Sequence, residues 1–192
     1  MKALAPLALL LALAAPAAQA TVVDFDDLPN SGTLADGYGG ITWGGNWAHY
    51  DSFQPPYNPS SPFTRIYADY NVLPGGTAFQ GVSFSFVIDA VFNGAFFAGH
   101  GSGSGFASIF FELFSNNVSV AVSGSLDANA TPTFLASGYG GLIDEVVVWG
   151  SAGFYVMDDV TYNTAAIPVP AALPLMLLAL GGLGVAARRR RG

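Results

Sequence analysis

The stretch VSFSFVID, residues 82–89, alternates apolar and polar side chains and decides the fold class. Successive side chains of a strand point to opposite faces, so Val82, Phe84, Phe86 and Ile88 would share one buried face. Five similar runs, rich in Val, Phe, Tyr and Thr and separated by Gly, Asn, Ser or Pro, follow at 108–114, 117–124, 131–137, 142–150 and 154–163. Short strands at this spacing predict an all-β fold, an antiparallel jelly-roll-like β-sandwich.

Residues 33–62 differ from these runs, because Gly, Pro, Asn and aromatic residues dominate them. We predict one short strand over residues 40–43, followed by a long ordered loop. Long loops inside a compact domain are often functional. We find neither an internal repeat nor a convincing amphipathic helix between residues 21 and 166, which we interpret as one domain.

The charges of this domain are strongly unbalanced, because Arg65 is its one base against thirteen acids. A net charge of about −12 repels nucleic acid and anionic lipid, so we expect no nucleic-acid partner. The chain has no cysteine, so disulfides cannot support the domain in an exported protein. Stability must come from the core, or a bound metal must help.

The first twenty residues have the three parts of a secretory signal peptide. Lys2 supplies the positive start, an apolar run follows, and Ala18 and Ala20 form a small-x-small cleavage site. An N-terminal membrane anchor is the alternative, but the apolar run is short and is interrupted by prolines. We therefore expect cleavage after Ala20, with the domain exported.

The chain ends with a second targeting pattern over residues 167–192. Residues 171–187 carry no charge and would form a helix of about 25 Å, the short limit for a bilayer span. The arginines that follow would stay in the cytoplasm as a stop signal: Arg188, Arg189, Arg190 and Arg191. Pro168 and Pro170 keep the preceding segment extended, a shape that a processing protease can grip.

This ending resembles the PEP-CTERM sorting signal of Gram-negative bacteria, in its VPLPA-type variant. The matching motif is Ile167, Pro168, Val169, Pro170 and Ala171, and Val169 stands where the parent motif has glutamate. The resemblance implies an exosortase-type processing enzyme as partner and an association with exopolysaccharide and biofilm matrix. It also implies only transient anchoring in the inner membrane, before release to the cell surface or outside. A permanent C-terminal anchor is the alternative.

The central domain is similar to the jelly-roll domains that often precede this sorting tail and, more distantly, to galactose-binding-like sandwiches. The order of VDFDDLP, VSFSF, IDEVVVWG and FYVMDDVTY carries this resemblance, which spans most of residues 21–163. In similar sandwiches, acidic residues of the first and last strands hold a structural calcium ion. The resemblance therefore implies calcium as a possible cofactor.

Asp26 and Asp158 are the ligands that we assign to such an ion. By period two, Asp158 would share an apolar strand face with Val156 and Val160, where an unsatisfied carboxylate is unfavourable. Calcium takes six to eight oxygen ligands and would satisfy it. Hydrogen bonds from backbone N–H groups would equally satisfy the carboxylate. Alternatively, a strand bulge would turn Asp158 away from the apolar face.

The Gly-rich segment contains five aromatic side chains, at Tyr38, Trp43, Trp47, Tyr50 and Tyr57. Exposed Trp and Tyr rings stack on the apolar faces of sugars, so Trp43, Trp47 and Tyr50 are candidate glycan contacts. The alternative is that these rings are half-buried and hold the loop on the sandwich.

No catalytic motif stands out in the sequence. His49 and His100 lack partners at metal-ligand spacing, and residues 99–105 fit no phosphate-loop or nucleophile-elbow pattern. A carboxylate pair such as Glu112 with Glu145 has no support. We therefore expect an exported, non-catalytic cell-surface or matrix protein; a carbohydrate-binding module is the alternative, and a hydrolase is a third.

Overall fold

The computed structural model describes residues 20–164, nearly all of the expected domain. No helix within this range is long and apolar enough to cross a membrane. The rest of the expected signal peptide, including Ala18, lies outside the described residues. So do the sorting motif, the helix over 171–187 and the arginine cluster, and all of these stay predictions.

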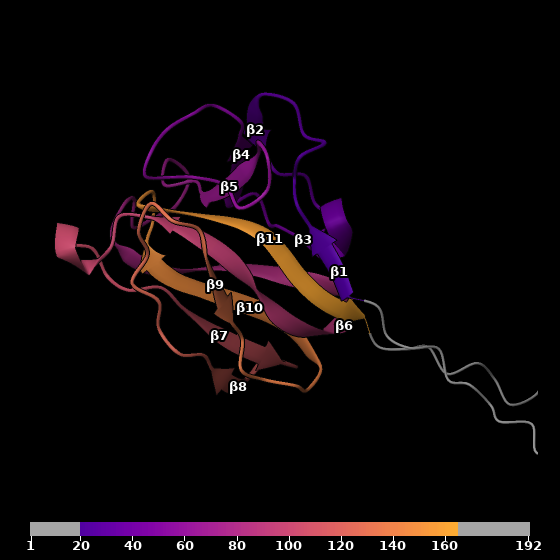
Figure 1. Cartoon of the computed structure of the whole chain (residues 1–192). Coiled ribbons are helices and arrows are strands. Elements are labelled where there is room, and N and C mark those ends of the chain that lie inside the picture. The colour runs from indigo at the N-terminus through magenta and orange to yellow at the C-terminus, as the bar shows by residue number, and fades with distance from the viewer. Residues whose placement is uncertain (1–19, 165–192) are drawn as a thin grey trace, which may run out of the picture. The chain divides into compact units, whose positions relative to one another are not determined.

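The described chain is all-β, with eleven strands in one antiparallel sheet (Figure 1). The strands are β1 Ala20–Val23, β2 Ser31–Thr33, β3 Ile41–Thr42, β4 Trp47–Tyr50, β5 Arg65–Ala68, β6 Phe79–Gly99, β7 Phe110–Ser115, β8 Val118–Val122, β9 Thr133–Ala136, β10 Ile143–Ser151 and β11 Tyr155–Thr164. Two short 3₁₀ helices, η1 Tyr38–Gly40 and η2 Ser102–Ser104, lie between them. Each of the six predicted runs contains a strand, so the all-β antiparallel class is confirmed.

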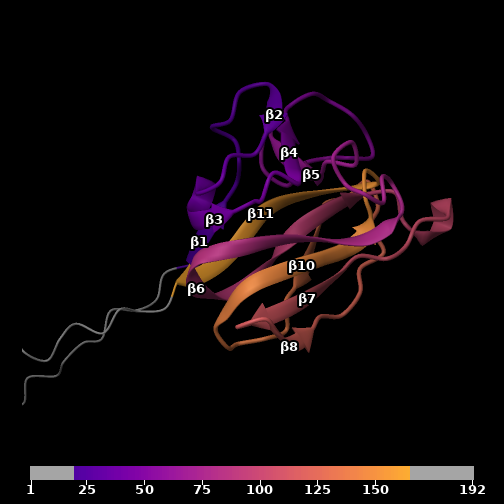
Figure 2. The same cartoon turned by 180° about the vertical axis from the view of Figure 1, so that it is seen from behind.

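The 21-residue strand β6 organises the sheet, because its two halves have different neighbours. The first half pairs with β10 and briefly with β3, and the second half pairs with β11 and β9. The strands follow the order β2-β4-β5-β11-β6-β10-β7-β8 (Figure 2). One long strand shared in this way gives the domain a sandwich-like form, with the core between the two parts.

The alternation in β6 holds through Phe86 and then fails. Val82, Phe84 and Phe86 are buried, whereas Ile88, which was expected on the same face, is exposed together with Val87. The cause is the register with β10, where Ile143 pairs with Ala90 but Glu145 pairs with Ser85. The β6 residues between these pairs have no partner on β10 and bulge outward.

The core is rich in aromatic rings, many of which pack edge to face. Trp43 and Trp47 are fully buried beside Phe84, at centroid distances of 5.2 Å and 6.3 Å. Trp47 belongs to β4, inside the segment that we predicted to be a loop after residue 43. Sequence reasoning missed this strand because it is only four residues long and comes soon after Gly44 and Gly45.

The first and last strands pair along four residues, from Ala20 with Asn163 to Val23 with Val160. The expected proximity of these two strands is therefore confirmed. It also means that both ends of the described domain leave from neighbouring positions on the same strand pair.

Candidate functional site

The outer face of β4, β5 and β11 carries the candidate site. Trp47, Ile66 and Met157 are fully buried and point into the core. By alternation, Tyr67 and Val156 point the other way, to the face that is turned from the core.

A loop over residues 51–64 covers part of this outer face. The Tyr57 hydroxyl donates to the Gly153 carbonyl at 3.1 Å, and the Asn58 side-chain amide donates to the Ala130 carbonyl at 2.6 Å. These contacts join the loop to the start of β11 and to the segment before β9. The loop thus forms a wall above the sheet.

A pocket of about 420 Å³ lies between this loop and the sheet, within the range of small-ligand sites. Five of its lining residues are tyrosines, and Tyr67 contacts Tyr50 and Tyr70 at centroid distances of 5.5 Å and 6.4 Å. None of its lining residues carries a charge; they are Tyr50, Gln54, Tyr57, Tyr67, Tyr70, Thr77, Gly153, Phe154, Tyr155 and Val156. We call this the tyrosine pocket.

The hydroxyls of Tyr50, Tyr57 and Tyr67 stay protonated at neutral pH. Burial raises the pKa of Tyr50, Tyr57 and Tyr67 above the ordinary value near 10. Each hydroxyl is therefore a hydrogen-bond donor as well as an acceptor. The pocket offers flat apolar rings together with neutral polar groups.

Arg65 stabilises the side of the tyrosine pocket that Tyr50 and the loop form. Its guanidinium carbon lies 3.9 Å from the centroid of the Tyr50 ring, a cation–π contact, and its side chain is buried. The two terminal nitrogens donate to the carbonyls of Phe63 and Ser52, near the two ends of the loop. Arg65 therefore fixes both the Tyr50 ring and the loop that faces it.

Two of the three predicted glycan contacts are wrong. Trp43 and Trp47 are completely buried, and their indole N–H groups donate to the carbonyls of Tyr38 and Ser83 at 3.1 Å and 2.9 Å. A sugar ring cannot reach them, because both of these large apolar side chains are packed inside the core. Tyr50 lines the pocket, and its contact with a glycan stays a prediction.

Sequence reasoning missed Tyr67 and Tyr70 as pocket residues. The alternation of Ile66 with Tyr67 was the available signal, but β5 is only four residues long and was not recognised as a strand. Phe154 was also missed, because it begins the run 154–163 that we predicted to be a strand. It lies instead at the turn before β11, in the pocket wall.

The two predicted calcium ligands lie on opposite sides of one loop segment, residues 60–64. Asp158 Oδ2 accepts hydrogen bonds from the backbone N–H groups of Ser60 and Ser61 at 2.8 Å and 2.9 Å, and from both hydroxyls. Asp26 Oδ1 accepts from the N–H groups of Phe63 and Thr64 at 3.0 Å and 2.9 Å. Both carboxylates thus hold the same loop.

Asp158 does not lie on the core face where period two placed it. A bulge at Asp159, whose φ is +47°, inserts an extra residue and reverses the alternation of β11. Met157 and Val160 therefore both belong to the core, while Asp158 points to the loop. The sequence analysis had named backbone donors and a bulge as alternatives to calcium, and the structure contains both.

These residues do not fit a calcium ion. The four donors at Asp158 Oδ2 direct their hydrogen atoms to the position that a cation would occupy. Asp26 accepts hydrogen bonds from a different pair of N–H groups, so the two carboxylates do not share a ligand position. Within residues 20–164, no group of three or more acidic or histidine side chains is arranged to hold a metal. Burial raises the pKa of Asp158 to about 6, which the donors only partly oppose.

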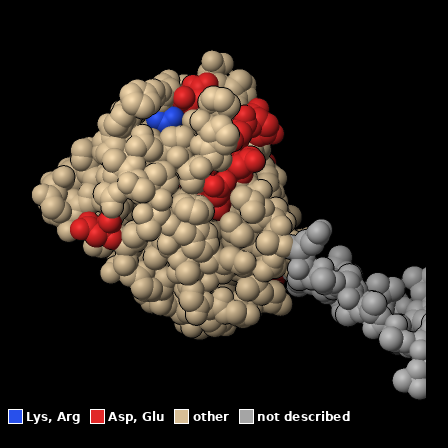
Figure 3. All heavy atoms as spheres, in the orientation of Figure 1, with Lys and Arg blue, Asp and Glu red and all other residues tan. Residues whose placement is uncertain are grey.

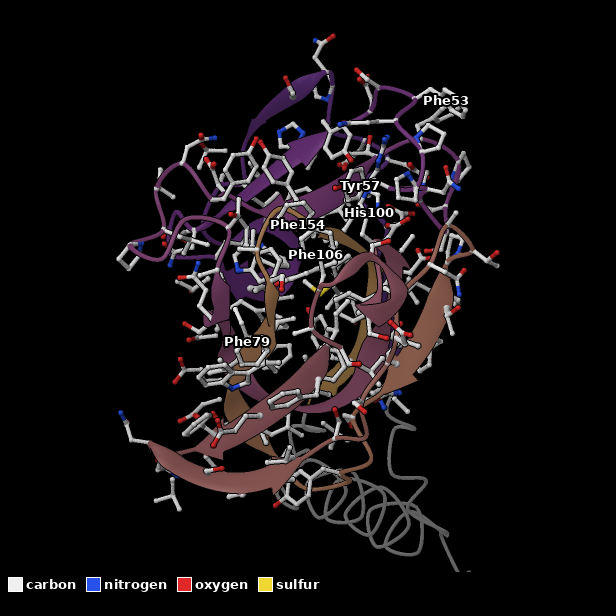
Figure 4. The ribbon with its side chains drawn as sticks, turned by 90° about the vertical axis from the view of Figure 1, so that its left-hand side faces the viewer. Phe53, Tyr57, Phe79, His100, Phe106 and Phe154 are labelled. Carbon is white, nitrogen blue, oxygen red and sulfur yellow. The ribbon has the colours of Figure 1, made fainter. Side chains whose placement is uncertain are left out.

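A second pocket, of about 570 Å³, has His100, Ser104 and Asp127 among its lining residues, the three residue types of a hydrolytic triad. Asp127 accepts from the Ser102 N–H at 2.6 Å and from its hydroxyl at 2.7 Å. The ring of His100 instead contacts Tyr57, Phe106 and Phe154 (Figure 4). Among residues 20–164, no hydrogen bond joins the His100 ring to a serine or a carboxylate, so the base contact of a triad is not formed.

Comparisons with protein-family models, curated proteins and solved structures found no match to this chain. The class of protein is therefore defined by the described residues: an all-antiparallel β-sheet domain with a tyrosine-lined pocket on one outer face.

Proposed function

We propose that this chain is an exported, non-catalytic cell-surface or matrix protein whose domain binds a neutral glycan in the tyrosine pocket. The observation that carries the glycan proposal is the set of five tyrosines around an uncharged pocket. Export and sorting rest on the two ends of the sequence and on their resemblance to the PEP-CTERM pattern.

The chemistry of the pocket matches that of a sugar. The C–H faces of a pyranose pack against aromatic rings, and its hydroxyls need donors and acceptors at the rim. The tyrosine hydroxyls, Gln54 and Thr77 supply such groups without any charge. An acidic polysaccharide is disfavoured, because the domain carries thirteen acids and one buried base.

The position of the pocket suits a protein that is held by its ends during sorting. Tyr155 and Val156, in the pocket, are at the start of β11, and Asn163 pairs with Ala20 near its other end. Eight residues of a strand span about 25 Å. The pocket is therefore well separated from the attachment points of the signal peptide and the sorting tail.

We expect the exported domain, residues 21–166, to fold without the two ends, since its core cluster lies wholly within residues 23–162. The test is a glycan array on this domain, with and without calcium, followed by calorimetry on each neutral glycan that binds. Tyr67→Ala should weaken binding by about 5- to 150-fold, because one ring stacks on a sugar for about 1–3 kcal/mol, as bases do on aromatic side chains.

Phe134→Ala is the matched control, because Phe134 is a partly exposed aromatic residue on β9 and is not a pocket residue. It should bind as the unchanged domain does. Binding that survives Tyr67→Ala, or no binding to any neutral glycan, would contradict the proposal.

A further inference from the structure

Strand β8 is an open edge of the sheet. It ends the strand order and pairs with β7 through residues on one side. Figures 1 and 2 both show it at the rim of the domain opposite β2. An edge strand of this kind presents a row of N–H and C=O groups that another strand can pair with.

Apart from one bulge, this edge lacks protection that soluble proteins usually give their edges, such as lysine and proline. At the other end of the strand order, β2 has only three residues and follows Pro29 closely. By contrast, residues 113–126 around β8 contain no charged residue and no proline. Three valines of β8 are exposed: Val118 at 61%, Val120 at 37% and Val122 at 61%.

The charge of the domain limits where two copies can meet. Copies with thirteen acids and one base repel each other over most of their surfaces. The lower rim in Figure 3, where β7 and β8 lie in Figure 1, shows no acidic atoms on this face. An uncharged, apolar edge is therefore the place where a second copy can approach.

The nearest acid on the neighbouring strand does not prevent this approach. Glu112 on β7 lies opposite Val122 and accepts a hydrogen bond from the Trp149 indole at 3.1 Å. In a pair joined at β8, the two β7 strands would be three strand spacings apart, about 14 Å. That exceeds the Debye length of about 8 Å at physiological salt.

We propose that β8 pairs with β8 of a second copy of this chain, antiparallel and about a twofold axis at Val120. An antiparallel strand pair of this kind is self-complementary, so the same edge serves both copies and the assembly closes as a dimer. Val120 would face Val120 of the second copy, and Val118 would face Val122. Val120 is the middle residue of β8, and a bulge leaves it without a partner residue on β7.

The first test is sedimentation equilibrium of residues 21–166 over a wide concentration range. We expect a monomer–dimer equilibrium that shifts toward dimer as salt is raised, because salt screens the repulsion between the acidic copies. Val120→Lys should shift the dissociation constant at least tenfold toward monomer, since two lysines would meet at the axis. Val72→Lys, at another exposed valine, should dimerise as the unchanged domain does.

The second test separates a lost interface from a damaged fold. Val120→Lys and Val120→Glu should each be monomeric alone, and their equimolar mixture should recover the dimer, because opposite charges then meet at the axis. In addition, oxidation of Val120→Cys should give a disulfide-linked dimer in this cysteine-free chain, whereas Val72→Cys should not.

Several results would overturn the proposal: a monomer at every concentration and salt, an open-ended series of larger species, or a Val120→Lys dimer as tight as that of the unchanged domain. A mixture of the Lys and Glu variants that stays monomeric would do the same. The proposal does not depend on glycan binding, so Tyr67→Ala should leave the dimer intact.

Discussion

At the scale of single residues, Asp158 is the most consequential side chain of the domain. It is buried, accepts four hydrogen bonds at one oxygen, and accepts another at Oδ1 from the Asp159 N–H at 2.8 Å. Asp158→Ala would leave the N–H groups of Ser60 and Ser61 without this acceptor, whereas the two hydroxyls keep Asp159 and the Asp24 carbonyl as acceptors. We expect a loss of about 3–5 kcal/mol in the free energy of unfolding, measured by urea denaturation.

Acid should stabilise the domain through the same residue. Burial raises the pKa of Asp158 from its ordinary 3.8 to about 6, so the folded state binds a proton more readily than the unfolded state. The contribution is full below about pH 4 and is lost as the pH rises through about 6. Between pH 7 and pH 5, the free energy of unfolding should rise by roughly 1–2 kcal/mol.

Urea denaturation at the two pH values measures this change. Asp158→Asn should remove it, whereas Asp89→Asn, at an exposed carboxylate on β6, should keep it. An equal pH response in the unchanged domain and in Asp158→Asn would mean that another group is responsible.

The same carboxylate decides the calcium question. Because hydrogen-bond donors already surround Asp158 Oδ2, we expect millimolar calcium to leave the melting temperature of the chelator-treated domain unchanged. A rise of several degrees that Asp158→Asn abolishes would show instead that the ion displaces the donors.

At the scale of elements, the loop over residues 51–64 depends on its two carboxylate anchors. Asp26→Ala removes the acceptor for two N–H groups, so the loop should open locally while the core stays folded. We expect faster limited proteolysis between residues 51 and 64 and a loss of about 1–3 kcal/mol in overall stability. Asp36 also accepts two backbone N–H groups, at 2.7 Å each, but in the turn at Trp43 and Gly44. Asp36→Ala is therefore the matched control, and it should not accelerate cleavage in the loop.

The strands were the most predictable elements. The six runs from residue 82 onward were found because period-two alternation is a local property of an extended chain with one buried face. The four-residue strands β4 and β5 were missed, since so short a segment cannot show a period. Their pairing with each other and with β11 forms them, and that pairing joins residues far apart in the sequence.

At the scale of the whole molecule, sorting should remove both ends of the chain. Intact-mass analysis of protein released from the surface should show Thr21 as the first residue and the loss of residues 171–192. Replacing Pro168 and Pro170 together with alanine should retain the protein in the membrane, because the recognition segment could then join the helix. A full-length C-terminus on protein outside the inner membrane would contradict the sorting proposal.

The amino-acid sequence by itself determined the all-β class and the six strands from residue 82 onward, and it carries the two targeting patterns. These follow from composition and local period, which need no long-range contact. Only the tertiary structure decided which aromatic rings form the core and which line the pocket. Trp47 and Tyr50 look alike in the sequence, but they lie three positions apart on β4, so the first points into the core and the second lies beside the loop. One bulge at Asp159 likewise turned Asp158 from the core to the loop, because a single extra residue reverses every side chain of a strand.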